Sequence, residues 1–303
     1  MPPILVSGLI NLETTVKVDG FPIPYFPVRY PFFGIQSAVS GVGYNVASAL
    51  TTLGDKVRFL SLIGRDPTAE LVRGSLKKAG ISDRYVLPAR EQTAQSVILY
   101  DETGRRQINV DLKDLQQAEY PSETFVKALT GCRLAILCNI NFSRPFLVEA
   151  RRLKIPVASD VHAITSLDDP YNRDFMAQAD ILFQSHEALP CPPEDWATRL
   201  MEQFGTKIVV VGLGKEGALL GVREDRFLGR FPAQSTRPVV NTIGAGDALF
   251  SSFLHFWTRN GDPAHALRRA ILFASWKIGE PGAAMGFLPE ADLIALEEGR
   301  NTP

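Results

Sequence analysis

The sequence predicts an α/β fold in which helices cover both faces of a mostly parallel sheet, with a small β-structure over the main domain. Along most of the 303 residues, short apolar runs alternate with amphipathic segments. Strands that alternate with helices form parallel βαβ units, and these place helices on both faces of one sheet. Two segments, residues 14–34 and 96–112, interrupt the alternation, so we expect them to lie outside the main sheet.

The first half of the chain begins this alternation. Short apolar runs predict strands at Ile4–Val6, Val57–Ile63, Leu134–Asn139 and Val157–Asp160. Amphipathic segments that each end at a glycine predict helices at Tyr44–Leu53 and Thr68–Ala79. Ser143 and Pro145 begin a third helix, which runs to Leu153, because both residue types favour the start of a helix.

The second half continues the pattern and ends in helices. Strands are predicted at Ile181–Gln184 and Ile208–Val211, and a helix at Asp195–Phe204 ends at a glycine. A long apolar helix, Ala245–Arg259, is terminated by Asn260 and Gly261. Asp262 and Pro263 then cap and start a last helix, which runs to about Lys277.

The two interrupting segments predict the small β-structure. Thr14–Gly34 alternates short apolar pieces with prolines and aromatic residues, and Ser96–Leu112 alternates as a hairpin does, with a turn at Asp101–Gly104. The chain length suits one domain, residues 1–303, that carries this appendage.

Composition excludes several classes of partner and location. The formal net charge is −1 and no basic block stands out, which disfavours nucleic acid and anionic membranes as partners. Three cysteines, an odd number without a CxxC pair, do not form the pattern of a disulfide framework and fit a reducing compartment. The first residues lack the features of an export signal, and no apolar run approaches the roughly 18 residues of a membrane span. We therefore expect a cytoplasmic protein.

The strongest chemical signal is the segment NTIGAGD, residues 241–247, at the start of the long apolar helix. Gly244 and Gly246 leave backbone N–H groups uncovered at the positive end of the helix, where phosphate is the natural ligand. Asp247 lies in the first turn beside this anion site, and a carboxylate there can accept the proton of an attacking hydroxyl. A glycine-rich turn followed by an Asp that only suits the helix dipole is the alternative interpretation.

The segment resembles the signature DTxGAGD of the ribokinase-like (PfkB) family, and the resemblance extends along the chain. ILVSGLINLETTVKVDG, residues 4–20, is similar to the family's opening strand and lid entry. SGVGYNVASALTTLG, residues 40–54, resembles its substrate-side motif GGxGxNxAxxLxxLG. Residues 64–66 match its GxD motif, and VVGLGKEGALL, residues 210–220, is similar to its nucleotide-side strand and turn. Several independent motifs in the right order are far more specific than any one alone.

The resemblance implies a fold and a mechanism. Family members have a ribokinase-like three-layer α/β/α domain with a small β-sheet lid, which here would be residues 14–34 and 96–112. They transfer the γ-phosphoryl group of ATP to a hydroxymethyl group of a sugar or sugar-like substrate, with Mg²⁺. Such a protein must position two anionic partners, neutralise charge and exclude water. In some relatives two lids pair, so we expect a homodimer through the lid.

The resemblance also assigns residues, position by position. Asp247 falls on the catalytic Asp, with Gly244, Ala245 and Gly246 on the anion hole beside it. The substrate positions correspond to Asn11, Glu13, Gly41, Gly43 and Asn45. The nucleotide positions correspond to Thr242, Gly212, Gly214, Gly217 and Gln184. Glu187 falls on the Glu of the NxxE motif, which helps to organise Mg²⁺ through water.

Several positions depart from the family pattern. Asn241 replaces the first Asp of the signature, Gln184 replaces the Asn of NxxE, and Glu13 replaces the usual Asp of the substrate site. Ser40 replaces the first glycine of the substrate loop, and Ser251 and Ser252 replace the small residues after the catalytic Asp. In relatives that use K⁺, the loop with the first Asp of the signature helps to form the ion site. Because Asn241 removes a charge there, we expect weaker dependence on K⁺ than in those relatives.

Alternatives remain at the level of substrate and activity. The fold also hosts nucleoside kinases, and a catalytically weak ligand-binding or regulatory protein on the same scaffold is a further possibility. The aromatic residues of segment 14–34 suit either a ligand pocket or packing against a second subunit. Arg29, Arg105 and Arg106 are candidates for a substrate phosphate, whereas His162 and His186 are expected to be structural.

Overall fold

The computed structural model describes residues 1–299, and within them nine strands form one central sheet and four form a second, smaller sheet. The order in the central sheet is β13-β12-β11-β10-β9-β8-β1-β4-β5, and its strands run in one direction except β12, which is antiparallel to its neighbours β11 and β13. Its strands are β1 (Ile4–Ser7), β4 (Val57–Ile63), β5 (Tyr85–Pro88), β8 (Leu134–Leu137), β9 (Val157–Asp160), β10 (Ile181–Ser185), β11 (Ile208–Gly212), β12 (Ala218–Val222) and β13 (Phe227–Phe231).

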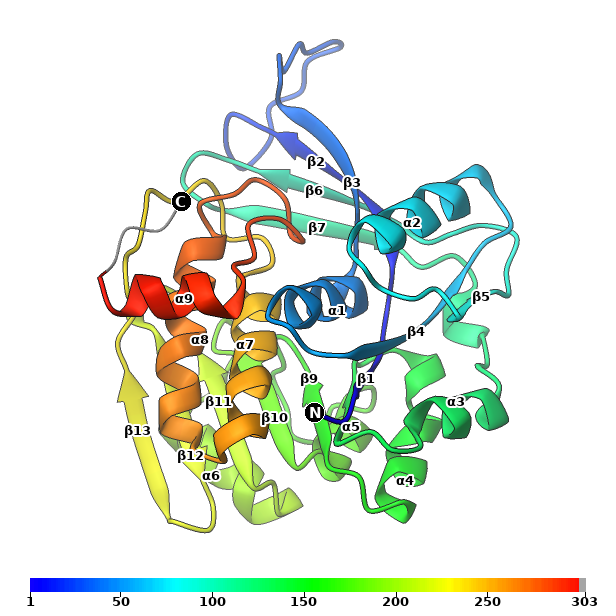
Figure 1. The fold of residues 1–303 in the computed structure, drawn as a ribbon. Helices are drawn as coiled ribbons and strands as arrows, with labels where there is room; N and C mark the ends of the chain where they lie inside the picture. The colour runs from blue at the N-terminus through cyan, green and yellow to red at the C-terminus, as the bar shows by residue number, and fades with distance from the viewer. Residues whose placement is uncertain (300–303) are drawn as a thin grey trace.

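Helices cover both faces of the central sheet, so the predicted three-layer α/β/α architecture is confirmed (Figure 1). The α-helices are α1 (Val42–Thr52), α2 (Pro67–Lys78), α3 (Ser122–Leu129), α4 (Pro145–Arg152), α5 (Arg173–Gln178), α6 (Pro193–Phe204), α7 (Ala245–Asn260), α8 (Pro263–Lys277) and α9 (Glu290–Glu297). Short 3₁₀ helices lie at Leu115–Gln117, Asn141–Ser143 and Gly214–Glu216. No helix within residues 1–299 is long and apolar enough to span a membrane.

Two hydrophobic clusters fill the space between the layers. Side chains alternate along each strand, so Ile4 and Val6 of β1 join the cluster under α1, α2, α7, α8 and α9, whereas Leu5 joins the cluster under α3 to α6. All four residues of β1 are buried, as expected for a parallel strand covered on both faces. Short apolar runs with little alternation therefore predicted these strands correctly.

The smaller sheet comprises β2 (Asn11–Lys17), β3 (Ile35–Ser40), β6 (Gln95–Tyr100) and β7 (Arg106–Asp111), in the order β3-β2-β6-β7. We call it the small sheet, and Figure 1 shows it above α1 and α7. The expected hairpin is present, and the Asp101 carboxylate accepts hydrogen bonds from the N–H groups of Thr103 and Arg105 in its turn. Residues 18–34, expected to be part of the β-structure, form a loop between β2 and β3 instead. Four prolines in that stretch cannot donate to a strand ladder.

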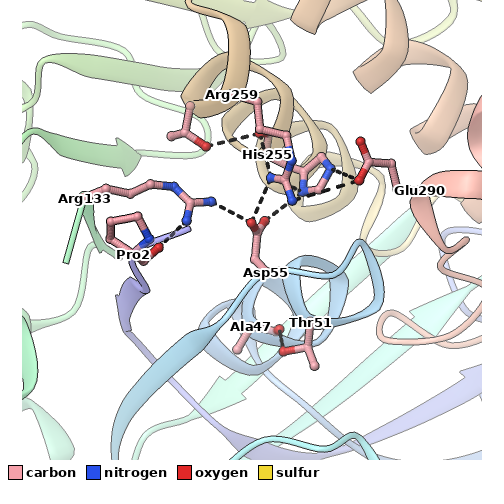
Figure 2. A network of polar contacts seen from close by, with 9 residues as sticks. Pro2, Ala47, Thr51, Asp55, Arg133, His255, Arg259 and Glu290 are labelled. Atoms are coloured by element: carbon pink, nitrogen blue, oxygen red, sulfur yellow. Dashed lines mark hydrogen bonds and ion pairs between the residues drawn. The ribbon is translucent and has the colours of Figure 1, made fainter. Parts of the chain in front are cut away.

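A buried network of charges ties the far end of α7 to the rest of the domain (Figure 2). Asp55, with a side chain 1% exposed, lies 2.6 Å from Arg133 Nη2, 2.8 Å from Arg259 Nη1 and 2.8 Å from His255 Nδ1. His255 Nε2 lies 3.5 Å from a carboxylate oxygen of Glu290, the first residue of α9. The network joins the start of β4, the approach to β8, and helices α7 and α9.

Candidate active site

Asp247 lies in the first turn of α7, which begins after Gly244. Gly246 and Asp247 are the second and third residues of the helix, so their N–H groups have no carbonyl partner within it. A Cβ added to Gly246 would meet no atom within 4 Å, so space is open beside this turn. The signature turn is therefore a helix start with uncovered N–H groups and a carboxylate beside them, which is the arrangement that an anion site requires.

The shape of this turn requires glycine at position 244. Gly244 has a φ of 76°, which favours glycine, and a Cβ there would lie 2.5 Å from the carbonyl oxygen of Ala283. The turn is thus pressed against residue 283. Ser251, one of the departures from the family pattern, donates its hydroxyl hydrogen bond to the Asp247 carbonyl over 2.6 Å.

A chain of polar side chains leads from Asp247 to the small sheet. Asn45 Nδ2 donates to Asp247 Oδ2 over 2.7 Å. The Ser40 hydroxyl lies 3.3 Å from Asn45 Oδ1 and 3.1 Å from Glu13 Oε2. Predicted substrate residues from β2 and α1 are therefore brought together with the predicted base. Ser40, noted only as a departure, is the link between them.

Burial raises the pKa of both carboxyl groups in this chain of hydrogen bonds, Asp247 and Glu13. Burial raises the pKa of Asp247 to about 6, although the hydrogen bond from Asn45 and the charges of His162 and Lys277 act in the opposite direction. Burial also raises the pKa of Glu13, which the Ser40 hydrogen bond partly opposes. A carboxylate whose pKa lies close to neutral pH is well suited to accept and release a proton.

The small sheet turns one face toward the signature turn. Alternation places Asn11, Glu13 and Thr15 on the same face of β2, and all three are buried. Ile98 is paired opposite Thr15 on that face and packs with Ile243 of the signature and with Ala283. We call the face that carries Asn11, Glu13, Thr15 and Ile98 the inner face of the small sheet.

Asn11 has an unused acceptor on the inner face. Its Nδ2 donates to the Ser96 hydroxyl over 3.0 Å, but its Oδ1 has no hydrogen-bond partner within residues 1–299. The side chain is 2% exposed. A buried polar atom normally has a partner, so this oxygen is available to a substrate hydroxyl.

The substrate-loop glycines allow two backbones to meet. Gly41 precedes α1, and Gly43 lies in its first turn. A Cβ on Gly43 would lie 2.5 Å from the carbonyl carbon of Gly8, the residue after β1. This close approach places α1, and hence Asn45, against the carboxyl end of β1.

The predicted nucleotide residues lie at the ends of β10 and β11 and in the signature turn. Gly212 ends β11, and Gly214 and Gly217 form the turn into β12. Gln184 is 4% exposed, and neither amide atom has a partner within residues 1–299. Phe183 belongs to the α7 face and Leu182 to the α5–α6 face, so alternation along β10 directs Gln184 toward α5–α6.

Arg106 of the small sheet joins two of the predicted positions. Its Nη1 donates to the Thr242 hydroxyl over 2.6 Å, and its Nη2 lies 3.9 Å from Glu187 Oε1. The sequence offered Arg106 only as one of three arginines for a substrate phosphate. Its contacts place a guanidinium, a good phosphate ligand, at the signature turn.

The two histidines near the site differ in their contacts. His186 Nδ1 lies 2.9 Å from the Gly212 carbonyl, so its ring joins the ends of β10 and β11. His162 follows β9 and has a φ of 58°. The backbone N–H of His162 donates to Asp160 Oδ1 over 2.8 Å.

The chain is similar to known proteins along nearly its whole length. A family model described as "pfkB family carbohydrate kinase" matches residues 3–291. The chain is 27% identical to the acarbose 7(IV)-phosphotransferase of an Actinoplanes species, covering 96% of this chain and 97% of that protein. It is 26% identical to the ATP-dependent ribose-1-phosphate kinase of Halopiger xanaduensis, covering 97% of each. Among solved structures, a microbiome-derived acarbose kinase superposes with a TM-score of 0.88 at 26% identity, covering 98% of this chain and 99% of that one.

Proposed function

Because the chain belongs to the pfkB family of carbohydrate kinases, we propose that it transfers the γ-phosphoryl group of ATP to a hydroxymethyl group of a sugar or sugar-like substrate. The observation that carries the proposal is the position of Asp247. This carboxylate has a raised pKa, lies beside uncovered N–H groups at a helix start, and is hydrogen-bonded through Asn45 toward Glu13.

The residues divide the reaction between them. Asp247 accepts the proton of the acceptor hydroxyl as the hydroxyl oxygen bonds to the γ-phosphorus. The bond between the γ-phosphorus and the bridging oxygen breaks, and ADP leaves with its electrons. The N–H groups of Gly246 and Asp247 and the Arg106 guanidinium are placed to stabilise the phosphoryl oxygens. The small sheet covers this region and limits the access of water.

A sugar is the proposed acceptor because polar groups meet at the inner face. Glu13 and the free oxygen of Asn11 are suited to two neighbouring hydroxyl groups, and bonds to a carboxylate are the stronger kind. A nucleoside is the second candidate, because Ile108 and Val110 extend the inner face with apolar side chains that are 52% and 50% exposed. A base could lie against that surface.

One assay tests the proposal and separates the candidates. ADP release is measured with ATP and a panel of sugars, oligosaccharides, sugar phosphates and ribonucleosides. We expect a sugar or sugar derivative to give the highest kcat/KM. If a ribonucleoside is preferred by about tenfold or more, the chain is a nucleoside kinase. If no member of the panel releases ADP, the weak regulatory homologue becomes the better description.

Mg²⁺ is the proposed metal, with Glu187 as its carboxylate. Within residues 1–299 no group of three or more His, Cys, Asp or Glu side chains is arranged to hold a metal ion. That fits Mg²⁺, which usually binds through one or two carboxylates, water and the phosphates of the nucleotide. Glu187 follows β10, its side chain is 62% exposed, and it lies near Arg106. Bound with the nucleotide, Mg²⁺ would neutralise phosphate charge.

Glu187→Gln is expected to raise the Mg²⁺ concentration needed for half-maximal activity by about threefold or more, because a neutral amide is a weaker ligand. The measurement is a Mg²⁺ titration of ADP release at saturating ATP. Glu123→Gln, an exposed change on α3, is the control. An unchanged Mg²⁺ curve in Glu187→Gln would assign the metal to another carboxylate.

We also propose a homodimer through the small sheet. Its outer face carries Ile35 and Val97, which are 56% and 41% exposed, and its outermost strands β3 and β7 have open edges. The loop at 18–34 exposes Tyr25 and Phe33 by 88% and 98%. Apolar surface of this extent is typical of a contact with another chain.

Sedimentation at micromolar concentration is expected to show a dimer, and Ile35→Glu combined with Val97→Glu is expected to shift it to monomer. A wild-type monomer at that concentration would contradict the proposal.

Three free cysteines, of which Cys132 and Cys138 are buried, support the proposed cytoplasmic location.

A further inference from the structure

Lys277, the last residue of α8, is a fully buried lysine beneath the signature turn. Its side chain is 0% exposed, and its ammonium group donates a hydrogen bond to the Ile243 carbonyl. Ile243 immediately precedes Gly244, so this bond holds the turn from which α7 starts. Burying a charged amine is unfavourable unless it is paired, so its retention here calls for a role.

The charges around Lys277 belong to the candidate active site. Burial lowers the pKa of Lys277 to about 8, against the charges of Asp247, Glu13 and Glu280, which act to raise it. Arg237 is also nearby and pairs with Glu280 over 3.1 Å. Glu280 therefore has a cation of its own, which leaves Asp247 and Glu13 as the carboxylates that Lys277 balances.

Two backbone carbonyls and one side-chain oxygen beside the signature turn already have internal donors. Asn241 Nδ2 donates to the Pro281 carbonyl over 2.7 Å, and Asn241 Oδ1 accepts from the N–H of Ile243 over 3.0 Å. The Ile243 carbonyl is taken by Lys277. A free metal cation would need several such oxygens at once. These internal donors compete with a monovalent ion for the oxygens beside the signature turn, and one of the donors is the ammonium group of Lys277.

We propose that Lys277 is a positioning residue that serves the signature turn as a covalently attached monovalent cation, so that phosphoryl transfer needs no added K⁺. The proposal rests on the kinase function proposed above. One ammonium group holds the Ile243 carbonyl and balances the negative charges of Glu13 and Asp247. The turn then keeps the geometry that presents its N–H groups to phosphate.

Two substitutions separate charge from packing. Lys277→Ala removes the ammonium and leaves room for an ion, whereas Lys277→Met removes the charge but fills most of the space. Lys78→Ala is the matched control, because Lys78 is also the last residue of its helix but is exposed. ADP release is measured in NaCl, KCl, NH₄Cl and methylammonium chloride at constant ionic strength. ADP affinity by calorimetry and the Tm are measured in the same salts.

In the wild type and Lys78→Ala, we expect rates that agree within about twofold across the four salts. In NaCl, Lys277→Ala is expected to lose about tenfold or more in kcat/KM. KCl, NH₄Cl or methylammonium chloride should raise the kcat/KM of Lys277→Ala about fivefold above its value in NaCl. The same ion should tighten ADP binding by this variant and raise its Tm. Lys277→Met is expected to lose activity without recovery, since its side chain blocks the ion.

Three results would overturn the proposal. They are strong activation of the wild type by K⁺, full activity of Lys277→Ala in NaCl, and equal losses in both variants that no cation reverses. The ADP-binding and Tm measurements do not depend on turnover. If no substrate of the panel is phosphorylated, they still decide the role of Lys277 separately from the proposed function.

Discussion

Replacing Asp247 by Asn is expected to lower kcat by about 100-fold or more while leaving nucleotide affinity nearly unchanged. Asn has almost the same shape, and its Oδ1 can still accept the hydrogen bond that Asn45 donates over 2.7 Å. It cannot accept the proton of the acceptor hydroxyl. The measurements are steady-state ADP release with the best acceptor and ADP affinity by calorimetry.

The pH dependence gives this prediction a second, independent readout. Burial raises the pKa of Asp247 to about 6, so the wild-type kcat/KM should fall as the pH drops below that value and the carboxylate becomes protonated. The residual activity of Asp247→Asn should lack this acidic limb. A variant with activity within a factor of a few of the wild type, or with the same limb, would remove Asp247 from the role of base.

Stability distinguishes loss of the base from loss of the fold. A raised carboxyl pKa means that the folded protein binds the proton more tightly than the unfolded chain, so stability decreases as the pH rises through about 6. Asp247→Asn cannot ionise and should be at least as stable as the wild type at pH 7. Asp262→Asn, which keeps a good helix cap on α8, is the control for the same change of charge elsewhere.

Local patterns were sufficient for most of the central sheet and for its long helices. The strands at Val57–Ile63 and Val157–Asp160 were predicted to the residue, because apolar runs mark them. Helix α8 was predicted to end at about Lys277, which is its last residue. Helix α5 and strand β13 were not predicted. Helix α5 has only six residues, and β13 is mostly exposed, so neither carries a clear period.

The site shows the same division between local and tertiary information. Asp247, Asn45 and Glu13 lie within motifs, so the sequence identified them before the structure joined them. Lys277 could not be recognised in this way, because a lysine in the last turn of a helix usually faces solvent and suits the helix dipole. Only the packing of α8 against the signature turn buries it.

The buried charges at the far end of α7 were also invisible to the sequence. Asp55 and His255 are 200 positions apart and belong to no motif. Their proximity follows from the packing of α7 against α1, which ends shortly before Asp55, and Figure 2 shows the arginines that complete the group. This network should dominate stability in the way that Asp247 dominates activity.

Asp55→Asn is expected to lower the free energy of unfolding by about 3–5 kcal/mol, because it removes the buried carboxylate that Arg133, Arg259 and His255 share. Burial alone would raise the pKa of Asp55, but the hydrogen bonds and charges of His255 and Arg259 outweigh it and lower the pKa. The stabilisation is therefore present above the ordinary pKa of Asp and is lost as the pH falls through the lowered value. Denaturant unfolding at pH 7 and at acidic pH measures both effects, and the gap between wild type and variant should narrow in acid.

Activity per folded molecule should survive this change, since Arg259 lies 12 residues beyond Asp247 on α7 (259 − 247), about 18 Å along the helix. Glu149→Gln, which breaks an exposed ion pair with Arg152, is the control and should alter stability by less than about 1 kcal/mol. If Asp55→Asn unfolds at the same denaturant concentration as the wild type, the buried network does not hold α7 to the sheet. If it keeps its stability but loses turnover, the network acts on Asp247 along the helix and does not serve stability alone.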